Sequence, residues 1–215
     1  MATLLHIDSS LNGENSVSRE VTRTFRETWE KQHPRGTVIY RDLDAEPLPH
    51  LTRVSHYAAA VPAEERTPEQ RSAFAERERL IVELESADAV VIGAPLYNYG
   101  VPTTLRSYLD HVIVAGRTLG PDSTIAGKPV TVVTSRGGSY AAGTPREGQD
   151  FNAPYLEHLL GTALALDVRF IVPELTLARI IPAMADLVGL ADTSRAQAHE
   201  AARTHATALA AAHHA

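Results

Sequence analysis

The sequence contains no cysteine in its 215 residues. A chain without thiols can form no disulfide, no thiolate nucleophile, no Cys-ligated zinc site and no cysteinyl iron–sulfur cluster. Proteins of reducing compartments manage without disulfides, and we therefore expect a cytoplasmic protein.

Basic residues are also in short supply, because 20 Lys and Arg stand against 26 Asp and Glu, for a net charge of −6. Binding of nucleic acid needs a basic face that neutralises phosphates, so we expect no nucleic-acid partner. Long apolar runs are missing, and residues 1–8 lack the basic flank of a signal peptide. We therefore expect a soluble protein with no membrane insertion.

Two nucleotide-binding fingerprints are missing as well. No G-x-G-x-x-G occurs, and the one Gly-Lys pair, Gly127-Lys128, is followed by Pro129 instead of Ser or Thr. The sequence therefore contains neither the dinucleotide-binding fingerprint nor a P-loop.

The ten histidines show neither H-x-x-x-H nor H-E-x-x-H spacing. We therefore predict no metal site and expect solvated or interface histidines. His111 and His158 are expected within helices, and His213 and His214 at a frayed terminus.

The chain has enough apolar residues, 44%, to form a sizeable core. Short apolar runs, expected to be strands, alternate with longer amphipathic stretches, expected to be helices. The expected strands are 3–8, 37–41, 87–93, 129–134 and 168–172, and the expected helices are 17–33, 67–86, 102–116, 154–166 and 191–212. A capping box of Thr67 and Gln70 supports the second helix, in which residues 76–79 (Glu-Arg-Glu-Arg) are expected to form a solvated face.

This alternation predicts an α/β protein with a five-stranded parallel sheet and right-handed crossovers. The favoured strand order is 2-1-3-4-5, in a flavodoxin-like three-layer sandwich that forms one domain over residues 1–215. Ligands of such folds bind at the carboxyl ends of the strands, near the switch point between strands 1 and 3, where the strand order reverses. In this sequence, loops with residues suited to ligand binding follow the expected strands 1, 3 and 4.

The first of these loops, residues 9–18, is rich in Ser and Asn and leads into a helix. Free N–H groups at a helix N-terminus, together with the hydroxyls of Ser10, Ser16 and Ser18, form an anion site suited to a phosphate monoester. The alternative is that Ser16 is only a helix cap.

The second loop reads APLYNYGVPT over residues 94–103. Prolines at 95 and 102 favour an extended path, whose backbone groups would face the edge of a planar heterocycle. Tyr97 and Tyr99 offer faces for stacking, and Asn98 can both donate and accept. The alternative is a rigid turn whose aromatic side chains pack on the core.

The third loop, residues 134–143, holds Gly137 and Gly138 directly after a strand. Consecutive glycines let a backbone approach a ligand closely and present N–H groups to it. Ser139 lacks the second glycine of a G-x-S-x-G nucleophile elbow, so a serine hydrolase is not favoured. A phosphate site, a ring-edge site and a set of backbone donors together describe an FMN site.

At these residues the sequence resembles the FMN-dependent NADH-azoreductases, relatives of the NAD(P)H–quinone reductases with a flavodoxin-like fold. The motifs that carry the resemblance are Ser9-Ser10, Ser16-Val17-Ser18, the run from Pro95 to Tyr99, the run from Thr134 to Gly138, Arg41-Asp42-Leu43, residues 105–110 and Pro154-Tyr155-Leu156. Almost the whole chain is covered.

The resemblance implies FMN as cofactor, NADH or NADPH as co-substrate, and a quinone or azo compound as acceptor. It implies that the phosphate end of FMN is bound by Ser10, Ser16, Val17 and Ser18. It implies that the ring is bound by Pro95, Leu96, Tyr97, Asn98, Tyr99, Ser135, Arg136, Gly137 and Gly138. It also implies a homodimer with active sites at the interface.

The sequence departs from the family at Tyr99, where Phe is usual, and in a shortened segment over residues 117–125. If that segment covers the substrate in relatives, we expect a more open pocket here.

One site that takes the nicotinamide and then the acceptor predicts ping-pong kinetics, with the hydride carried by the flavin and no catalytic side chain. The N–H groups of Gly137 and Gly138 are candidates for stabilising negative charge on the reduced ring. Asn98, Tyr99 and Tyr140 are candidates for the substrate pocket. A specialised biosynthetic flavin reductase, a flavodoxin-type electron carrier and a module that has lost FMN remain alternatives.

Overall fold

The computed structural model describes residues 1–212, with side chains to residue 209. Its centre is a five-stranded, all-parallel sheet in the order β2-β1-β3-β4-β5, which confirms the predicted topology. The strands are β1 (Thr3–Asp8), β2 (Thr37–Asp42), β3 (Ala89–Gly93), β4 (Pro129–Val133) and β5 (Asp167–Ile171). The helices are α1 (Val17–Gln32), α2 (Arg53–Ala58), α3 (Pro68–Ser86), α4 (Thr103–Val112), α5 (Asn152–Leu156) and α6 (Val188–Ala212).

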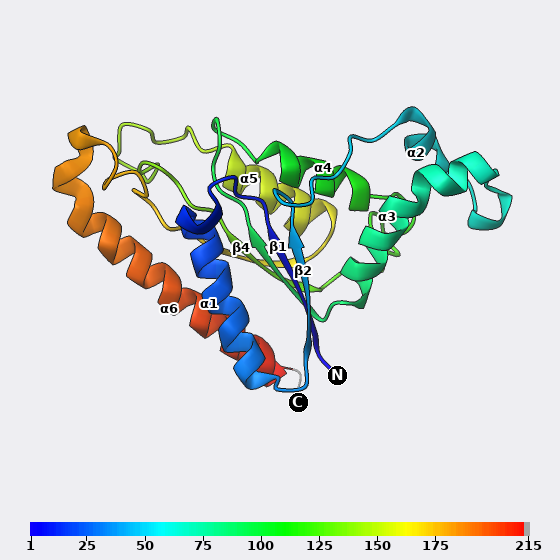
Figure 1. Ribbon diagram of the computed structural model, residues 1–215, viewed down its shortest axis with the longest axis horizontal. Helices are drawn as coiled ribbons and strands as arrows, with labels where there is room; N and C mark the ends of the chain where they lie inside the picture. The colour runs from blue at the N-terminus through cyan, green and yellow to red at the C-terminus, as the bar shows by residue number, and fades with distance from the viewer. Residues whose placement is uncertain (213–215) are drawn as a thin grey trace.

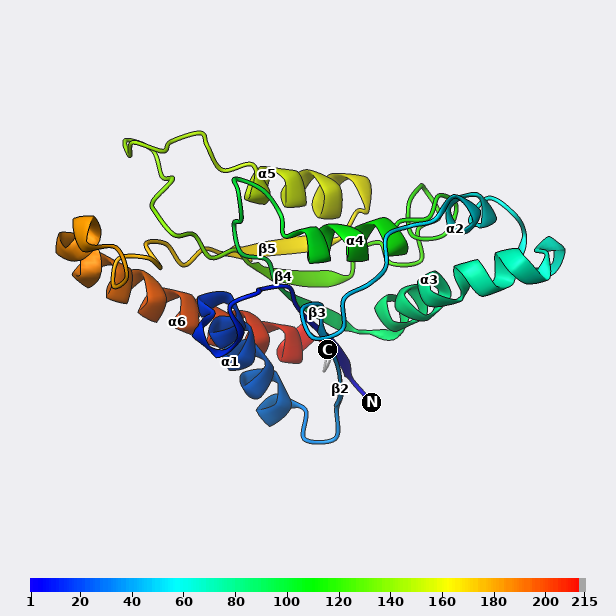
Figure 2. The same ribbon diagram turned by 45° about the horizontal axis from the view of Figure 1, so that its top comes forward.

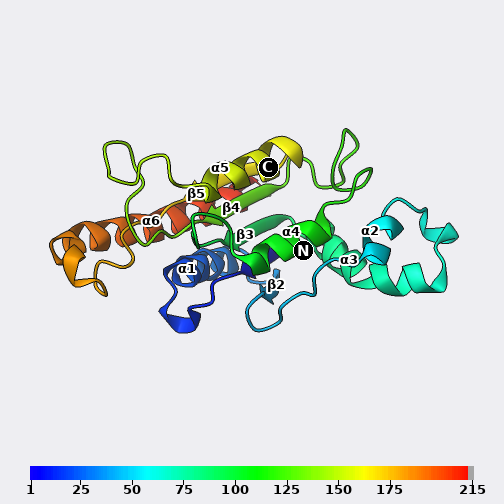
Figure 3. The same cartoon turned by 90° about the horizontal axis from the view of Figure 1, so that it is seen from above.

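The helices form one layer on each face of the sheet (Figure 1). On one face, α1 and α6 lie side by side (Figure 1, Figure 3), and Phe25 and Trp29 of α1 pack with Leu4 of β1 in the core. On the other face, α3, α4 and α5 pack against alternate strand residues such as Leu5 and Ile92. Because successive side chains of a strand point to opposite faces, both layers have a core. Trp29 is buried, as its place on an apolar helical stripe predicts.

The capping box of α3 is present, since Thr67 Oγ1 accepts from the N–H of Gln70 while Gln70 Oε1 accepts from the N–H of Thr67. The prediction of a solvated Glu-Arg-Glu-Arg face is wrong at Arg77, whose side chain is buried. The Arg77 guanidinium donates to the carbonyls of His111 and Ile113, both at 2.9 Å. These are carbonyls at the end of α4, which have no partner within the helix.

Helix boundaries differ from the prediction at three places. α4 ends at Val112 instead of residue 116, because Thr118 accepts from the N–H of Val114 and donates to the carbonyl of Val112. α5 starts at Asn152 and continues as a π-helical segment, Glu157–Ala163, while α6 starts three residues early.

His111 lies within α4, as predicted, but it is not the solvated or interface histidine that was expected. Its side chain is buried, and Nδ1 lies 2.8 Å from the carbonyl oxygen of Ser107. His213 and His214 lie outside the described residues. Of the helices within residues 1–212, none is long and apolar enough to cross a membrane.

The short segment over residues 117–125 joins α4 to the start of β4 and lies near α3 (Figure 2). Arg117 pairs there with Glu78 at 2.7 Å and Glu85 at 2.8 Å, near the end of α3. This is the edge of the sheet at which the strands begin, opposite to the loops after β1, β3 and β4. The segment therefore lies away from the three loops of the same chain, and the expectation of a more open pocket stays a prediction.

Candidate functional site

The three predicted loops meet at the edge of the sheet where the strands end. We call them loop 1 (residues 9–16), loop 2 (94–102) and loop 3 (134–143). Ser9 donates to the carbonyl of Gly93 through both its N–H, at 3.1 Å, and its hydroxyl, at 2.6 Å. The N–H of Leu96 donates to the carbonyl of Ser135 at 2.9 Å. Loop 1 is therefore bonded to the end of β3, and loop 2 is bonded to loop 3.

Loop 1 ends in a capped helix. Ser16 Oγ accepts from the N–H of Arg19 at 3.3 Å, so Ser16 is indeed the N-cap of α1. Its hydroxyl also lies 3.1 Å from that of Ser18, and both side chains are buried. The cap satisfies one donor of the first turn. The N–H groups of Val17 and Ser18 have no intrahelical acceptor and lie at the positive end of the helix dipole. The cap and an anion site are thus compatible.

Tyr97 joins loop 2 to loop 1. Its hydroxyl lies 3.0 Å from Ser10 Oγ and accepts from the N–H of Leu11 at 3.1 Å. The aromatic side chain is half-buried. The polar end of Tyr97 therefore fixes the backbone next to the predicted phosphate site.

The extended path predicted for residues 95–102 is wrong beyond Leu96, because loop 2 reverses in a tight turn. The N–H of Tyr97 donates to the carbonyl of Gly100 and the N–H of Gly100 to the carbonyl of Tyr97, at 3.0 and 2.9 Å. Between them, Asn98 and Tyr99 have φ of 48° and 67°. Left-handed backbone at residues other than glycine is strained and concentrates at functional sites. The turn presents Asn98 and Tyr99 as exposed side chains.

The glycines of loop 3 pack against the segment that follows β5. The carbonyls of Gly137 and Gly138 accept from the N–H groups of Leu177 and Leu175, both at 3.2 Å. A Cβ on Gly137 would lie 2.6 Å from Leu177 Cδ1, so a larger residue there would displace the Leu177 side chain. Within residues 1–212, the N–H groups of these glycines donate to no acceptor.

Arg136 has its guanidinium occupied within the protein. It pairs with Glu174 at 3.2 Å and with Asp150, and only 13% of its side chain is exposed. Glu174 also accepts from the hydroxyl of Ser139 at 2.9 Å and the N–H of Tyr140 at 3.0 Å. Arg136 and Glu174 therefore hold loop 3 in shape.

Asn152 was not predicted by the sequence, yet it joins loops 2 and 3. Its buried amide donates to the carbonyl of Ala94 at 2.8 Å and to Thr134 Oγ1 at 2.9 Å. Asn152 and Glu174 are single polar residues far along the chain from the loops they hold, and no local pattern marks them.

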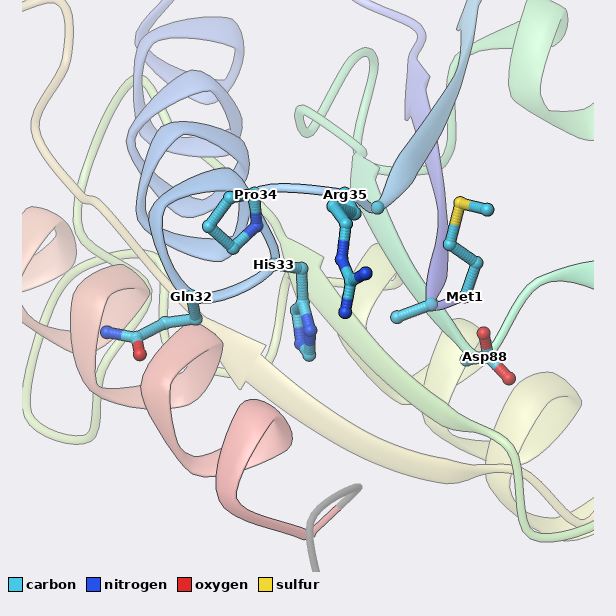
Figure 4. Close-up of a pocket in the computed structure, with 8 residues that line it drawn as sticks. Met1, Gln32, His33, Pro34, Arg35 and Asp88 are labelled. Carbon is cyan, nitrogen blue, oxygen red and sulfur yellow. The ribbon is translucent and has the colours of Figure 1, made fainter.

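Open cavities lie beside the loops and at the far end of the sheet. One, of about 560 Å³, adjoins loop 2 and is lined mostly by apolar groups, among them Val101, Phe151 and Tyr155. Another, of about 590 Å³, lies at the opposite end of the sheet, where the N-terminus meets His33, Arg35 and Asp88 (Figure 4). A third cavity, of about 520 Å³, borders loop 1 and is lined by Glu14, Arg19 and Asp42 among others.

The donor set fits FMN. Neutral hydroxyls and first-turn N–H groups suit its phosphate, and the backbone N–H groups of Gly137 and Gly138, which have no acceptor among residues 1–212, suit the polar edge of its ring. Arg19 and Arg136 are already paired with carboxylates, and Arg146 donates to the hydroxyl of Tyr140 in loop 3 at 3.1 Å.

Comparison with known proteins supports this fit. The flavodoxin-like fold family matches residues 2–208. The chain is 57% identical to an FMN-dependent NADH:quinone oxidoreductase of Streptomyces avermitilis, over 98% of each chain. It is 55% identical to one from Streptomyces coelicolor, over 97% of this chain and 96% of the relative.

Solved structures share the fold. The azoreductase AzrA superimposes with a TM-score of 0.80 at 24% identity, over 95% of this chain and 99% of that one. An FMN-dependent NADH-azoreductase from Bacillus anthracis, crystallised with FMN, gives a TM-score of 0.77 at 21% identity, over 96% and 100% of the chains. Because identity to the Streptomyces relatives extends over nearly the full length, this chain belongs to the family of FMN-dependent NADH:quinone oxidoreductases, with a flavodoxin-like fold.

Proposed function

We propose that this protein is an FMN-dependent NADH:quinone oxidoreductase. The observation that carries the proposal is the junction of the three loops at the carboxyl edge of β1, β3 and β4, where loop 2 is bonded to both loop 1 and loop 3. This is the edge at which open parallel sheets bind ligands. The identity to named quinone oxidoreductases supports the reaction.

The phosphate of FMN would be held at the start of α1, by the hydroxyls of Ser10, Ser16 and Ser18 and by the N–H groups of Val17 and Ser18. The ring would be bound by loops 2 and 3. This assignment keeps the residues that the sequence predicted, with Arg136 as a support of loop 3. Its guanidinium is committed to Glu174 and Asp150.

FMN, when bound, supplies the chemistry of accepting a hydride and returning two electrons. The chain supplies binding and orientation. The N–H groups of Gly137 and Gly138 would donate to the edge of the ring that becomes negative on reduction, as preorganised donors do for developing charge. Asn98, Tyr99 and Tyr140 would border the acceptor.

We also propose a homodimer whose active sites lie at the interface. Phe151 is 63% exposed and Tyr99 is 49% exposed, and both lie beside the predicted ring site. Large apolar side chains of this kind favour an interaction surface. The proposal is tested by the mass of the protein in solution and by the effect of Phe151→Glu on that mass.

Initial-velocity kinetics test the function. NADH and menadione are varied together with FMN-loaded protein. We expect parallel double-reciprocal lines, because each substrate occupies the same site in turn. Intersecting lines would contradict the proposal that both substrates use one site. If no quinone were turned over, the proposed oxidoreductase activity would be contradicted.

A further inference from the structure

Arg19 lies behind loop 1, in the first turn of α1, with 10% of its side chain exposed. Its guanidinium donates to the carbonyl of Ser10 twice, from Nε at 3.1 Å and from Nη2 at 2.7 Å. On the other side it makes a bidentate pair with Asp42, at the end of β2, with both bonds at 2.6 Å. Arg19 thus ties loop 1 to the neighbouring strand.

No donor of Arg19 is left for a ligand. A guanidinium has five N–H groups. Two bonds go to Ser10 and two to Asp42, and Nη1 also donates to the hydroxyl of Tyr40 at 3.3 Å. An arginine beside a phosphate site usually binds the phosphate itself. Here it could do so only by breaking these bonds.

The peptide between Ser10 and Leu11 is held at both ends. Its carbonyl is bound by Arg19, and its N–H donates to the hydroxyl of Tyr97 at 3.1 Å. Ser10 Oγ, on the same residue, accepts from the N–H of Asn12 at 3.3 Å. The orientation of Arg19 therefore sets the direction in which loop 1 presents its donors.

The charge of Arg19 is balanced by its partner. Hydrogen bonds from Arg19 lower the pKa of the Asp42 carboxyl, so the pair is ionised at neutral pH. Because the charges of Arg19 and Asp42 cancel, the pair adds little net positive charge to the phosphate site, and its effect is to fix the geometry of loop 1.

We propose that Arg19, held by Asp42, is a positioning residue for the phosphate end of FMN, acting through the Ser10 carbonyl without touching the ligand. The inference rests on the proposed function, because it assumes that loop 1 binds the phosphate. In this role the bidentate hydrogen bonds of Arg19 fix the conformation of loop 1, whereas in the alternative role the charge of Arg19 would attract the phosphate directly.

The test compares FMN with riboflavin, which lacks the phosphate, on the apoprotein by quenching of flavin fluorescence. The variants are Arg19→Lys, which keeps the charge but loses the fork, and Asp42→Asn, which loosens the fork. The control is Arg41→Lys, since Arg41 has the same side-chain exposure of 10% and a bidentate pair with Glu83 at 2.6 and 2.5 Å. Arg41 has no bond to loop 1.

We expect Arg19→Lys and Asp42→Asn each to raise the Kd for FMN by about tenfold or more, the loss typical of a charge-assisted hydrogen bond. The Kd for riboflavin should change by less than about threefold. Arg41→Lys should leave the ratio of the two Kd values as in the wild type. Thermal melting of each apoprotein separates loss of fold from loss of affinity.

Two results would overturn the inference. Retention of the wild-type ratio by Arg19→Lys would show that charge suffices, and tighter FMN binding by Asp42→Asn would show that Arg19 acts as a free cation. If Arg19→Lys fails to fold, Asp42→Asn decides. Wild-type protein that binds no FMN would instead overturn the proposed function.

Discussion

The hydroxyl of Tyr97 lies 3.0 Å from that of Ser10, which joins the loop after β3 to the loop after β1. The same hydroxyl accepts from the N–H of Leu11. One phenol thus connects the predicted ring site to the predicted phosphate site. The arrangement of both loops depends on an atom that Phe lacks.

Tyr97→Phe should therefore weaken FMN binding by about three- to tenfold, the cost of one or two neutral hydrogen bonds. Because the ring is kept, the fold should be retained. The measurement is an FMN titration of the apoprotein, with Tyr57→Phe as control, since Tyr57 is 60% exposed and outside the loops. Equal affinity in both variants would show that the Tyr97 hydroxyl does not organise the site.

Gly137→Ala should destabilise the protein by about 1 kcal/mol, the lower end of the cost of overpacking, because the new Cβ would lie 2.6 Å from Leu177 Cδ1 and displace that partly exposed side chain. The measurement is urea unfolding. Gly138→Ala is the stability control, since the nearest atom to its Cβ belongs to the Arg146 side chain at 3.7 Å. If Gly138→Ala destabilised the protein as much, loop 3 would not pack as described.

Arg77→Met should cost about 2–4 kcal/mol, because it removes the donors of several buried carbonyls at the end of α4. Arg79→Met, two residues along the same helix, should cost less than about 1 kcal/mol, since Arg79 is largely exposed and pairs with Glu76. Urea unfolding compares the two. Similar losses of stability in the two variants would mean that Arg77 does not bind the carbonyls at the end of α4.

Acid should destabilise the native state partly through Glu85, whose pKa is lowered from its ordinary value of 4.5 by hydrogen bonds from Arg117. A lowered folded pKa means that the unfolded state binds the proton more readily. Its contribution is therefore complete above pH 4.5 and is lost as the pH falls through the folded pKa.

Urea unfolding between about pH 7 and pH 3 checks this, because Glu85→Gln should lose less stability over that range than the wild type. Glu200→Gln is the control, since Glu200 is 69% exposed. If Glu85→Gln lost more stability than the wild type over this pH range, the ion pair of Glu85 with Arg117 would be contradicted.

The features that could be predicted from the sequence are those that a regular residue pattern encodes. Apolar runs and helical periods predicted five strands in the observed order, and the ends of β1, β3 and β4 marked the loops that meet. The turn at Asn98 and Tyr99 was missed because left-handed backbone is normally signalled by glycine, and neither residue is one.

Other residues were missed because they act across long stretches of chain. Asn152 bonds to Ala94, and Glu174 bonds to Ser139 and Arg136, with no local motif at either residue. Arg77 stands in a charged run that is typical of a solvated face, and only the position of α4 makes it buried. Such tertiary contacts override local pattern.

The central claim, that this chain binds FMN and passes two electrons from NADH to a quinone, is tested most directly by an anaerobic absorbance titration. Purified protein loaded with FMN receives NADH and then menadione. We predict that NADH bleaches the visible flavin absorbance at one equivalent and that menadione restores it. Flavin that stays oxidised after NADH would contradict the account.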